Sequence, residues 1–170
     1  LGNKVQKIMS EGLLVSDDIV LDLIKNQLSE IGDDGFLLDG YPRNISQAKS
    51  LKDLLETINK PLDYTILINV PSEILIKRLS GRRTCSLTGK TLNIYFSSQS
   101  ELDECLSNGG ELLQREDDNE DSIIKRIEVY EEQTEPMIDF YKSEGLLETI
   151  DGQGSINDVY GRLKKLMELK

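Results

Sequence analysis

Apolar residues recur at three- and four-residue steps over much of the chain, a spacing that predicts amphipathic helices. Gly12 ends the first predicted helix, and Ser16-Asp17-Asp18 supplies side chains that cap the start of the second. The apolar positions of these two helices are Val5, Ile8 and Met9, and then Ile19, Val20, Leu23, Ile24 and Leu28. Similar series predict helices over residues 48–55, 72–79 (capped by Ser72), 122–141 (bent at Pro136) and 157–170.

Short β-branched and apolar runs lie between these helices. The strongest covers residues 64–70 and is closed by Pro71, and a second covers residues 146–150. Phe36-Leu37-Leu38 is a third run, short enough to lie buried in a parallel sheet. Because strands alternate with helices, the sequence predicts an α/β fold with a parallel sheet.

Residues 81–110 interrupt this alternation. They are rich in Ser, Thr, Gly and Asn, and their only β-like patch is Leu92–Phe96. We expect no helix in this segment. An insertion of about 30 residues is long for a plain connection and is usually functional.

Composition narrows the function classes. With 170 residues, of which 38% are hydrophobic, the chain can form one domain with a proper core. A net charge of -11 and the absence of histidine argue against a nucleic-acid partner, which would require a basic face. Residues 116–121 hold much of the acidity, and such a run predicts a solvated helix start.

The sequence predicts a cytoplasmic protein without a membrane partner. No stretch approaches the roughly 18 apolar residues of a membrane helix, and no signal peptide opens the chain. Cys85 and Cys105 could pair, but in the cytosol we expect them to stay reduced. The acidic surface offers no self-complementary patch, so we expect a monomer.

Residues 35–48 carry the most specific chemistry. Asp39 follows the apolar run at the edge where open α/β sheets bind ligands, and Gly40 and Pro42 then turn the chain so that Arg43 faces the site. Gln47 lies four residues after Arg43, on the same face of a helix. A guanidinium beside an amide suits a phosphate and a base, although an ordinary strand and proline turn is the simpler alternative.

Arginines bracket the insertion. Arg78 and Arg82 precede it, Arg115 follows it, and Arg126 lies eleven residues further on. Phosphoryl transfer requires cations and donors around the transferring group, with water excluded. A mobile cover with cations at its hinges is what a kinase lid needs.

With these two motifs, essentially the whole chain resembles the adenylate kinases. The resemblance implies the P-loop NTPase fold of the nucleoside-monophosphate kinase type, a three-layer α/β architecture with a parallel sheet flanked by helices and an inserted lid. The implied domains are the remainder of the AMP-binding domain at 1–28, the core at 29–80 and 119–170, and the lid at 81–118.

The resemblance also assigns roles to residues. For AMP it implies Leu13, Leu14 and Val15 around the base, Gly40, Tyr41, Pro42, Arg43 and Gln47 at the phosphate and base, and Arg115 and Arg126 at the transferring phosphates. For ATP it implies Arg78, Arg82, Thr91, Leu92 and Gly154. For catalysis it implies Arg82, Arg115 and Arg126, with Asp39 ordering hydrated Mg2+. Asp117 and Asp118 match an acidic pair that either acts directly or caps a helix and pairs with the arginines.

The sequence departs from that family in three places: at the phosphate-binding loop, at the zinc positions of the lid, and at Leu92, where the family often has tyrosine beside ATP. The phosphate-binding loop G-x-x-x-x-G-K and its strand do not occur, and the sequence opens with Leu1-Gly2, so we expect a fragment whose missing elements precede it by about 40 residues. Without that loop, these residues alone should bind ATP phosphates poorly. No structural zinc is expected, because the four lid positions make a poor tetrahedral site and better resemble a hydrogen-bonded polar cluster. These positions are Cys85, Thr88, Cys105 and Asn108.

The expected function is that of an adenylate kinase, which converts ATP and AMP reversibly into two ADP with Mg2+ and serves purine nucleotide homeostasis. Its partners would be ATP, AMP and ADP. Two alternatives remain open from the sequence. One is a UMP/CMP- or GMP-type kinase, and the other is a truncated module that binds a nucleotide without catalysis.

Overall fold

The computed structural model describes residues 17–32 and 34–168. The helix predicted around Val5 and the candidate AMP-base residues Leu13, Leu14 and Val15 lie outside the described residues. The chain divides into two compact units. The first comprises residues 1–65 and 131–147, and the second comprises residues 66–130 and 148–170.

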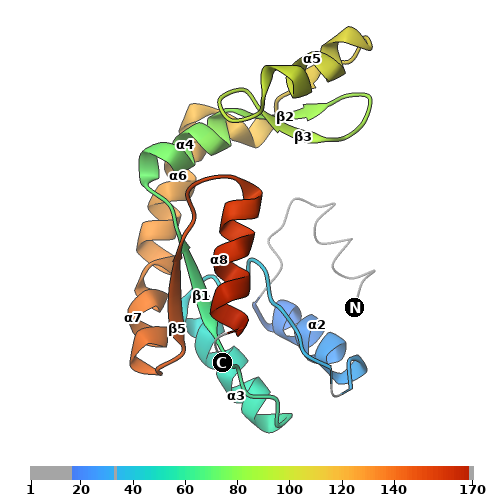
Figure 1. The fold of residues 1–170 in the computed structure, drawn as a ribbon. Coiled ribbons are helices and arrows are strands. Elements are labelled where there is room, and N and C mark those ends of the chain that lie inside the picture. The colour runs from blue at the N-terminus through green and yellow to red at the C-terminus, as the bar shows by residue number, and fades with distance from the viewer. Residues whose placement is uncertain (1–16, 33, 169–170) are drawn as a thin grey trace. The chain divides into compact units, whose positions relative to one another are not determined.

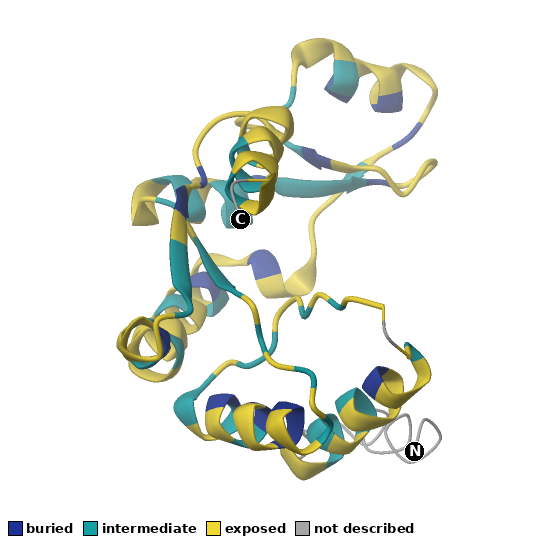
Figure 2. Ribbon diagram, turned by 60° about the horizontal axis from the view of Figure 1, so that its bottom comes forward, coloured by how far each residue is buried: buried dark blue, intermediate teal, exposed yellow. Residues whose placement is uncertain are grey.

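The first unit is built on three helices: α2 (Asp17–Glu30), α3 (Ile45–Thr57) and α7 (Pro136–Ser143) (Figure 1). The helices predicted over 19–28 and 48–55 are confirmed, and both are a few residues longer than predicted. Apolar positions spaced three and four apart place the buried residues of α3 along one side of the helix (Figure 2). Leu51 and Leu55 pack there with Leu28 of α2, and Ala48 packs with Met137 and Tyr141 of α7.

The strand predicted at Phe36-Leu37-Leu38 is wrong. The segment has no regular secondary structure, and no strand pairs with it among the residues that the structure describes. Phe36 and Leu38 pack against the cluster around Leu51, whereas Leu37 is 77% exposed. The run is therefore covered on one side only, and a strand requires hydrogen bonds to a neighbouring strand as well as apolar residues.

The predicted parallel sheet is present as two paired strands, β1 (Thr65–Asn69) and β5 (Leu147–Asp151). The N–H of Thr65 donates to the carbonyl of Leu146, and the N–H of Gly152 donates to the carbonyl of Asn69. Because the pairing advances in the same direction along both segments, the strands are parallel. Both strands lie where the sequence predicted them.

Helices follow the two parallel strands, as predicted. They are α4 (Ser72–Ser80) and α8 (Ile156–Glu168). The predicted cap of α4 is wrong: Pro71 occupies the N-cap, no side chain caps the helix, and Ser72 is its first residue. None of the described helices combines the length and the apolar character needed to cross a membrane.

The inserted segment folds as a small sheet and a helix. Strands β2 (Arg82–Cys85), β3 (Thr91–Asn93) and β4 (Leu112–Leu113) form an antiparallel sheet in the order β3-β2-β4. Helix α5 (Gln99–Ser107) follows β3 (Figure 1). The expectation of a helix-free insertion is therefore wrong.

A capping box starts this unexpected helix. The Ser98 hydroxyl accepts from the Glu101 N–H, and the Glu101 carboxylate accepts from the Ser98 N–H. The hydrogen bond from the Ser98 N–H, followed by those from Lys90 and the Ser98 hydroxyl, lowers the pKa of the Glu101 carboxyl. The spacing Ser-x-x-Glu was the sequence signal for α5.

Cys85 and Cys105 form a disulfide, so the expectation of reduced thiols is wrong. Strand β2 and helix α5 bring both cysteines into one buried cluster with Leu92 and Leu102. The expected polar cluster does not form either. The Thr88 hydroxyl accepts from the N–H of Lys90, and the Asn108 amide donates to the carbonyl of Glu104. In the described part of the chain, no group of three or more His, Cys, Asp or Glu residues could hold a metal ion.

The helix predicted over 122–141 forms in three parts. It comprises α6 (Glu120–Val129), the π-helical turn η2 (Tyr130–Thr134) and α7. Pro136 occupies the first turn of α7, where its missing N–H costs nothing, and the helix is divided just before it; the predicted bend at this proline stays a prediction. Short π-helical turns often occur at functional sites.

Candidate functional site

Residues 39–47, which we call the Arg43 turn, connect the irregular segment to α3. Gly40 has a φ of 74°, and the Tyr41–Pro42 peptide bond is cis. The Arg43 Nε donates to the carbonyl of Gly40 at 2.7 Å, and a Cβ on Gly40 would stand 3.3 Å from Arg43 Nη2. The positive φ favours glycine at position 40, and a Cβ there would also require the guanidinium of Arg43 to shift slightly.

Hydrogen bonds fix the backbone of Arg43 on both sides. Its N–H donates to Gln47 Oε1 at 2.7 Å, and its carbonyl accepts from the hydroxyl of Thr134 at 2.8 Å. Asn44 caps α3 by accepting from the N–H of Gln47 at 2.9 Å. The guanidinium of Arg43 is exposed and bonds, among the described residues, only to Gly40, so its Nη atoms are available to a ligand.

Gln47 has a second partner from a distant part of the sequence. Its Nε2 donates to Asp17 Oδ1 at 2.7 Å across a separation of 30 residues. Asp17 lies in the first turn of α2. Helix α2, which begins 28 residues before α3, therefore holds the side-chain amide of Gln47, the group that the sequence assigns to base recognition.

Two other predicted residues of the turn differ in environment. Asp39 is exposed. The hydroxyl of Tyr41 is buried without a hydrogen-bond partner among the described residues. Burial and then the negative charge of Asp17 raise the pKa of Tyr41.

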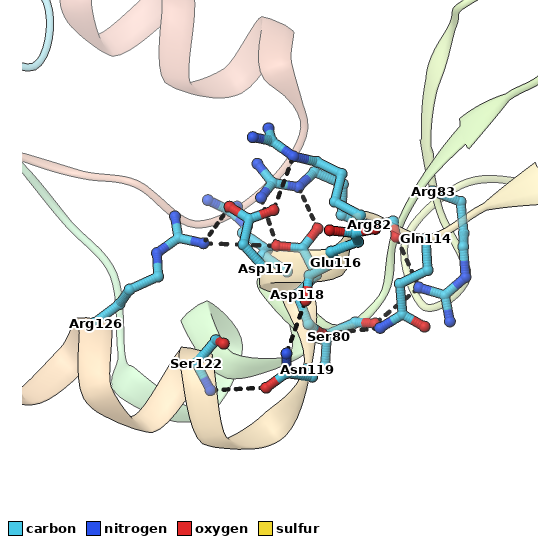
Figure 3. A network of polar contacts seen from close by, with 12 residues as sticks. Ser80, Arg82, Arg83, Gln114, Glu116, Asp117, Asp118, Asn119, Ser122 and Arg126 are labelled. Carbon is cyan, nitrogen blue, oxygen red and sulfur yellow. Dashed lines mark hydrogen bonds and ion pairs between the residues drawn. The ribbon is translucent and has the colours of Figure 1, made fainter. Parts of the chain in front are cut away.

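In the second unit, Asp118 is the centre of an arginine cluster (Figure 3). Arg82 binds it with two hydrogen bonds, from Nε to Oδ2 at 2.7 Å and from Nη2 to Oδ1 at 2.5 Å. The side chain of Asp118 has no exposed surface, whereas that of Arg82 is 25% exposed. A bidentate arginine–carboxylate pair of this kind fixes both side chains in one plane.

Arg115 and Arg126 join the same cluster through Asp117. Asp117 pairs with Arg115 Nε at 3.1 Å and with Arg126 Nη1 at 3.6 Å, and Arg126 Nη1 also lies 3.6 Å from Asp118 Oδ1. Three guanidinium groups thus share two carboxylates, which leaves the cluster net positive. Arg115 and Arg126 each retain donors for an anion, whereas Arg82 has already used two of its three nitrogens.

The expectation that residues 116–121 form a solvated helix start is wrong for Asp118. It is 1% exposed and ends a short 3-10 turn, η1 (Glu116–Asp118). Its carbonyl accepts from Gln114, and the next residue, Asn119, caps α6 through the N–H of Ser122. Hydrogen bonds from Arg82, followed by the charges of the arginines, lower the pKa of Asp118 and keep it ionised.

The residues predicted for ATP are placed less uniformly. Arg78 on α4 donates to the carbonyl of Gly152 at 2.9 Å, and Gly154 lies in the same loop, with a φ of 100°. Thr91 is exposed on β3. The side chain of Leu92 is buried in the disulfide cluster, so a nucleotide contact at this position would fall to its backbone.

Sequence reasoning missed three residues that hold the Arg43 turn. Asn44 was detectable, because it stands three residues before the N–H that it caps. Asp17 was interpreted only as part of a helix cap, and Thr134 was not singled out. Their partners lie 30 and 91 residues away, and no local pattern reports a contact over such distances.

Comparisons with known proteins agree with this chemistry. Residues 1–146 match the family model described as "Adenylate kinase". A curated relative named adenylate kinase, from Thermodesulfovibrio yellowstonii, is 43% identical over 171 residues, covering 100% of this chain and 80% of that protein. The adenylate kinase of Bacillus subtilis is 42% identical, covering 98% of this chain and 77% of that protein.

A third relative, from Caldicellulosiruptor bescii, is also named adenylate kinase and is 42% identical over 171 residues, covering 100% of this chain and 80% of that protein. The matched residues therefore extend through both units. By the family model and by identities above 40% over almost its whole length, this chain belongs to the adenylate kinase family.

Proposed function

We propose that the protein transfers a phosphoryl group reversibly from ATP to AMP, giving two ADP, and so serves purine nucleotide homeostasis. The observation that carries the proposal is the cluster of Arg82, Arg115 and Arg126 around two aspartates, in a chain whose relatives are named adenylate kinase. Phosphoryl transfer depends on positive charge that is already in place when the transition state forms.

The Arg43 turn supplies the acceptor side of this proposal. The unpaired Nη atoms of Arg43 would bind the phosphate of AMP, and the amide of Gln47 would contact its base. Gly40, Tyr41 and Pro42 shape the turn that presents the guanidinium. Leu13, Leu14 and Val15 would complete the base pocket.

The arginine cluster supplies the charge for the transferring phosphate. Arg115 and Arg126 keep N–H groups that can donate hydrogen bonds to a phosphate. Their side chains are 56% and 45% exposed. Arg82 is held by Asp118 and would contribute its charge and its remaining nitrogen. Arg78, Thr91, Leu92 and Gly154 would line the ATP side.

The proposal includes Mg2+, which the adenylate kinase family typically uses with ATP. Magnesium in such sites keeps several waters and relies on one or two carboxylates together with substrate phosphates. The carboxylate of Asp39 fits this requirement, because it is exposed and can accept hydrogen bonds from metal-bound water. When bound, Mg2+ would neutralise charge on the phosphates of ATP.

Domain boundaries, oligomeric state and location complete the proposal. We propose the remainder of an AMP-binding domain at 1–28, a core at 29–80 and 119–170, and a lid at 81–118. The sheet β3-β2-β4 and α5 lie within the proposed lid. We propose a cytoplasmic monomer. The Cys85–Cys105 disulfide is unusual for that compartment, so thiol titration of protein freshly extracted from its host would test the location.

A substrate panel tests the proposed reaction. The full-length protein is assayed with ATP, Mg2+ and each of AMP, CMP, UMP and GMP, and formation of each nucleoside diphosphate is measured. We expect AMP to give the highest kcat/KM. A higher value for UMP, CMP or GMP would assign the protein to another nucleoside-monophosphate kinase. Nucleotide binding without turnover of any substrate would identify a binding module.

A further inference from the structure

The side-chain amide of Gln47 is held in one of its two orientations. The N–H of Arg43 is a donor and requires the oxygen Oε1, whereas the carboxylate of Asp17 is an acceptor and requires the nitrogen Nε2. Both hydrogen bonds measure 2.7 Å. Rotating the amide by half a turn would set N–H against N–H at Arg43 and carbonyl against carboxylate at Asp17. Two neighbours from different helices and turns therefore select the same orientation.

This orientation determines what the rest of the amide can recognise. Nε2 has a second hydrogen and Oε1 a second lone pair, and neither has a partner among the described residues. A donor and an acceptor side by side match a base edge that presents an acceptor next to an amino group. Adenine has this edge, with N1 and the 6-amino group, and cytosine has it with N3 and the 4-amino group. Hypoxanthine, guanine and uracil present the reverse order.

We propose that Asp17 is a positioning residue that sets the base selectivity of the acceptor site by fixing the amide of Gln47. This inference rests on the proposed function, in which Gln47 contacts the base. Asp17 itself touches Gln47 rather than the base. Asp17 lies in the first turn of α2, so the helix holds its carboxylate in place. The hydrogen bond from Gln47 to Asp17 therefore connects α2 to the start of α3.

The simpler role for Asp17 is that of a negative charge at a helix N-terminus. Asp18 has the same charge in the same turn of α2, and the Gln47 amide donates to Asp17 rather than to Asp18. Asp18→Asn is therefore the matched control. This substitution removes one charge from the start of α2 and leaves the hydrogen bond between Gln47 and Asp17 intact.

The test compares AMP with IMP, whose base differs from adenine only in replacing the amino edge by a carbonyl and a protonated N1. Wild-type protein, Asp17→Asn and Asp18→Asn are assayed at full length with ATP and each monophosphate. The amide introduced by Asp17→Asn can offer either an oxygen or a nitrogen, so one of the two constraints on Gln47 is lost. We expect the ratio of kcat/KM for AMP to that for IMP to fall about tenfold in Asp17→Asn, and to change less than about twofold in Asp18→Asn.

CMP provides the sharper discrimination. Cytosine presents the same order of acceptor and amino group as adenine, so the AMP:CMP ratio should stay within about twofold of wild type in Asp17→Asn. A parallel fall of the AMP:CMP and AMP:IMP ratios would mean that the substitution only damages the pocket, and would overturn the inference. An unchanged AMP:IMP ratio would overturn it as well.

Gln47→Ala separates failure of this inference from failure of the proposed function. If Gln47→Ala leaves the AMP:IMP ratio unchanged, the base contact itself is wrong. If Gln47→Ala collapses the ratio and Asp17→Asn does not, only the role of Asp17 is wrong. In the double variant Asp17→Asn, Gln47→Ala we expect the same AMP:IMP ratio as in Gln47→Ala alone. Should Asp17→Asn fail to fold, Asp17→Ser keeps a short polar side chain in the first turn of α2 while removing the carboxylate, and the same fall in the AMP:IMP ratio is expected.

Discussion

The Arg43 turn and the arginine cluster both present guanidinium groups to phosphate, but they hold them in different ways. At the turn, the arginine bonds to a backbone carbonyl three residues away, and no carboxylate pairs with it among the described residues. In the cluster, Arg82 is bound to a carboxylate 36 residues away, across the whole inserted segment. The guanidinium of Arg43 is therefore held by a local contact, whereas that of Arg82 is held by a contact between the two ends of the inserted segment.

This difference predicts different consequences of substitution. Arg43 can be removed without stranding a buried charge, so its loss should affect mainly the binding of the acceptor. The cluster contains a fully buried carboxylate, so the Arg82–Asp118 pair should stabilise the fold as well as the transition state.

The largest effect on stability is expected for Asp118→Ala. The substitution leaves Arg82 without its bidentate partner and should lower the free energy of unfolding by about 3 to 5 kcal/mol, the usual result of breaking a buried pair. Asp117→Ala is the control, because Asp117 is 51% exposed and its ion pairs should contribute about 1 kcal/mol or less. Urea unfolding of both variants measures the difference. Equal losses would show that Asp118 does not organise the cluster.

Acidification of the wild-type protein should reproduce part of the stability loss expected for Asp118→Ala. The folded state lowers the pKa of Asp118, so its ion pair stabilises the protein above the carboxyl's unfolded pKa and is lost as pH falls through the lower, folded value. Wild-type protein should therefore lose stability on acidification more steeply than Asp118→Asn. Parallel pH profiles from calorimetry would contradict this account.

Apart from substitutions in the Arg82–Asp118 pair, Arg126→Ala should reduce turnover more than any other arginine substitution. Arg126 is 45% exposed and keeps free donors, so its removal should leave the fold intact while lowering kcat by about 100- to 1000-fold, as for other preorganised donors. Lys125→Ala removes a neighbouring exposed charge and should leave kcat within about twofold. Steady-state ADP formation measures both. A variant that retained wild-type kcat would remove Arg126 from the site.

The disulfide should stabilise the inserted segment alone. It links residues separated by 20 positions inside the cluster of Leu92 and Leu102, and closing a loop of that length contributes about 3 kcal/mol. Reduction by dithiothreitol should therefore accelerate hydrogen exchange in β2, β3 and α5 and leave exchange in α3 unchanged. The Cys85→Ser, Cys105→Ser double variant should show the fast exchange with or without reductant. Acceleration in α3 of equal size would contradict a local role.

The smallest effect is expected at the turn. The Tyr41 hydroxyl is buried without a partner among the described residues, and removing such a group relieves its desolvation. Tyr41→Phe should therefore change the free energy of unfolding by less than about 1 kcal/mol, with a gain rather than a loss. Thermal unfolding measures it. A loss of several kcal/mol would show that the hydroxyl has a structural partner.

The sequence predicted those parts of the molecule whose causes are local. The strands β1 and β5 and the helices around them follow from apolar periodicity, and the composition of the Arg43 turn follows from the conformational needs of Gly40. The irregular conformation of Phe36-Leu37-Leu38 could not be foreseen, because pairing depends on a neighbouring strand.

The inserted segment was predicted less well for a similar reason. Helix α5 is short and mostly exposed, and only its capping box at Ser98 and Glu101 indicated it. The disulfide and the burial of Asp118 depend on tertiary contacts over 20 and 36 residues. The sequence grouped four arginines at the two ends of the insertion. The structure brings three of them together on Asp117 and Asp118, whereas Arg78 donates to the carbonyl of Gly152. These partners could be found only from the fold.

The division of labour between the two regions is tested most directly by the kinetics of Arg43→Ala in the full-length protein. KM for AMP and KM for ATP are measured separately at saturating Mg2+. Because Arg43 would bind the acceptor phosphate through charge-assisted hydrogen bonds, we expect KM for AMP to rise at least about tenfold and KM for ATP to stay within about twofold. A wild-type KM for AMP would contradict the assignment of the Arg43 turn to the acceptor.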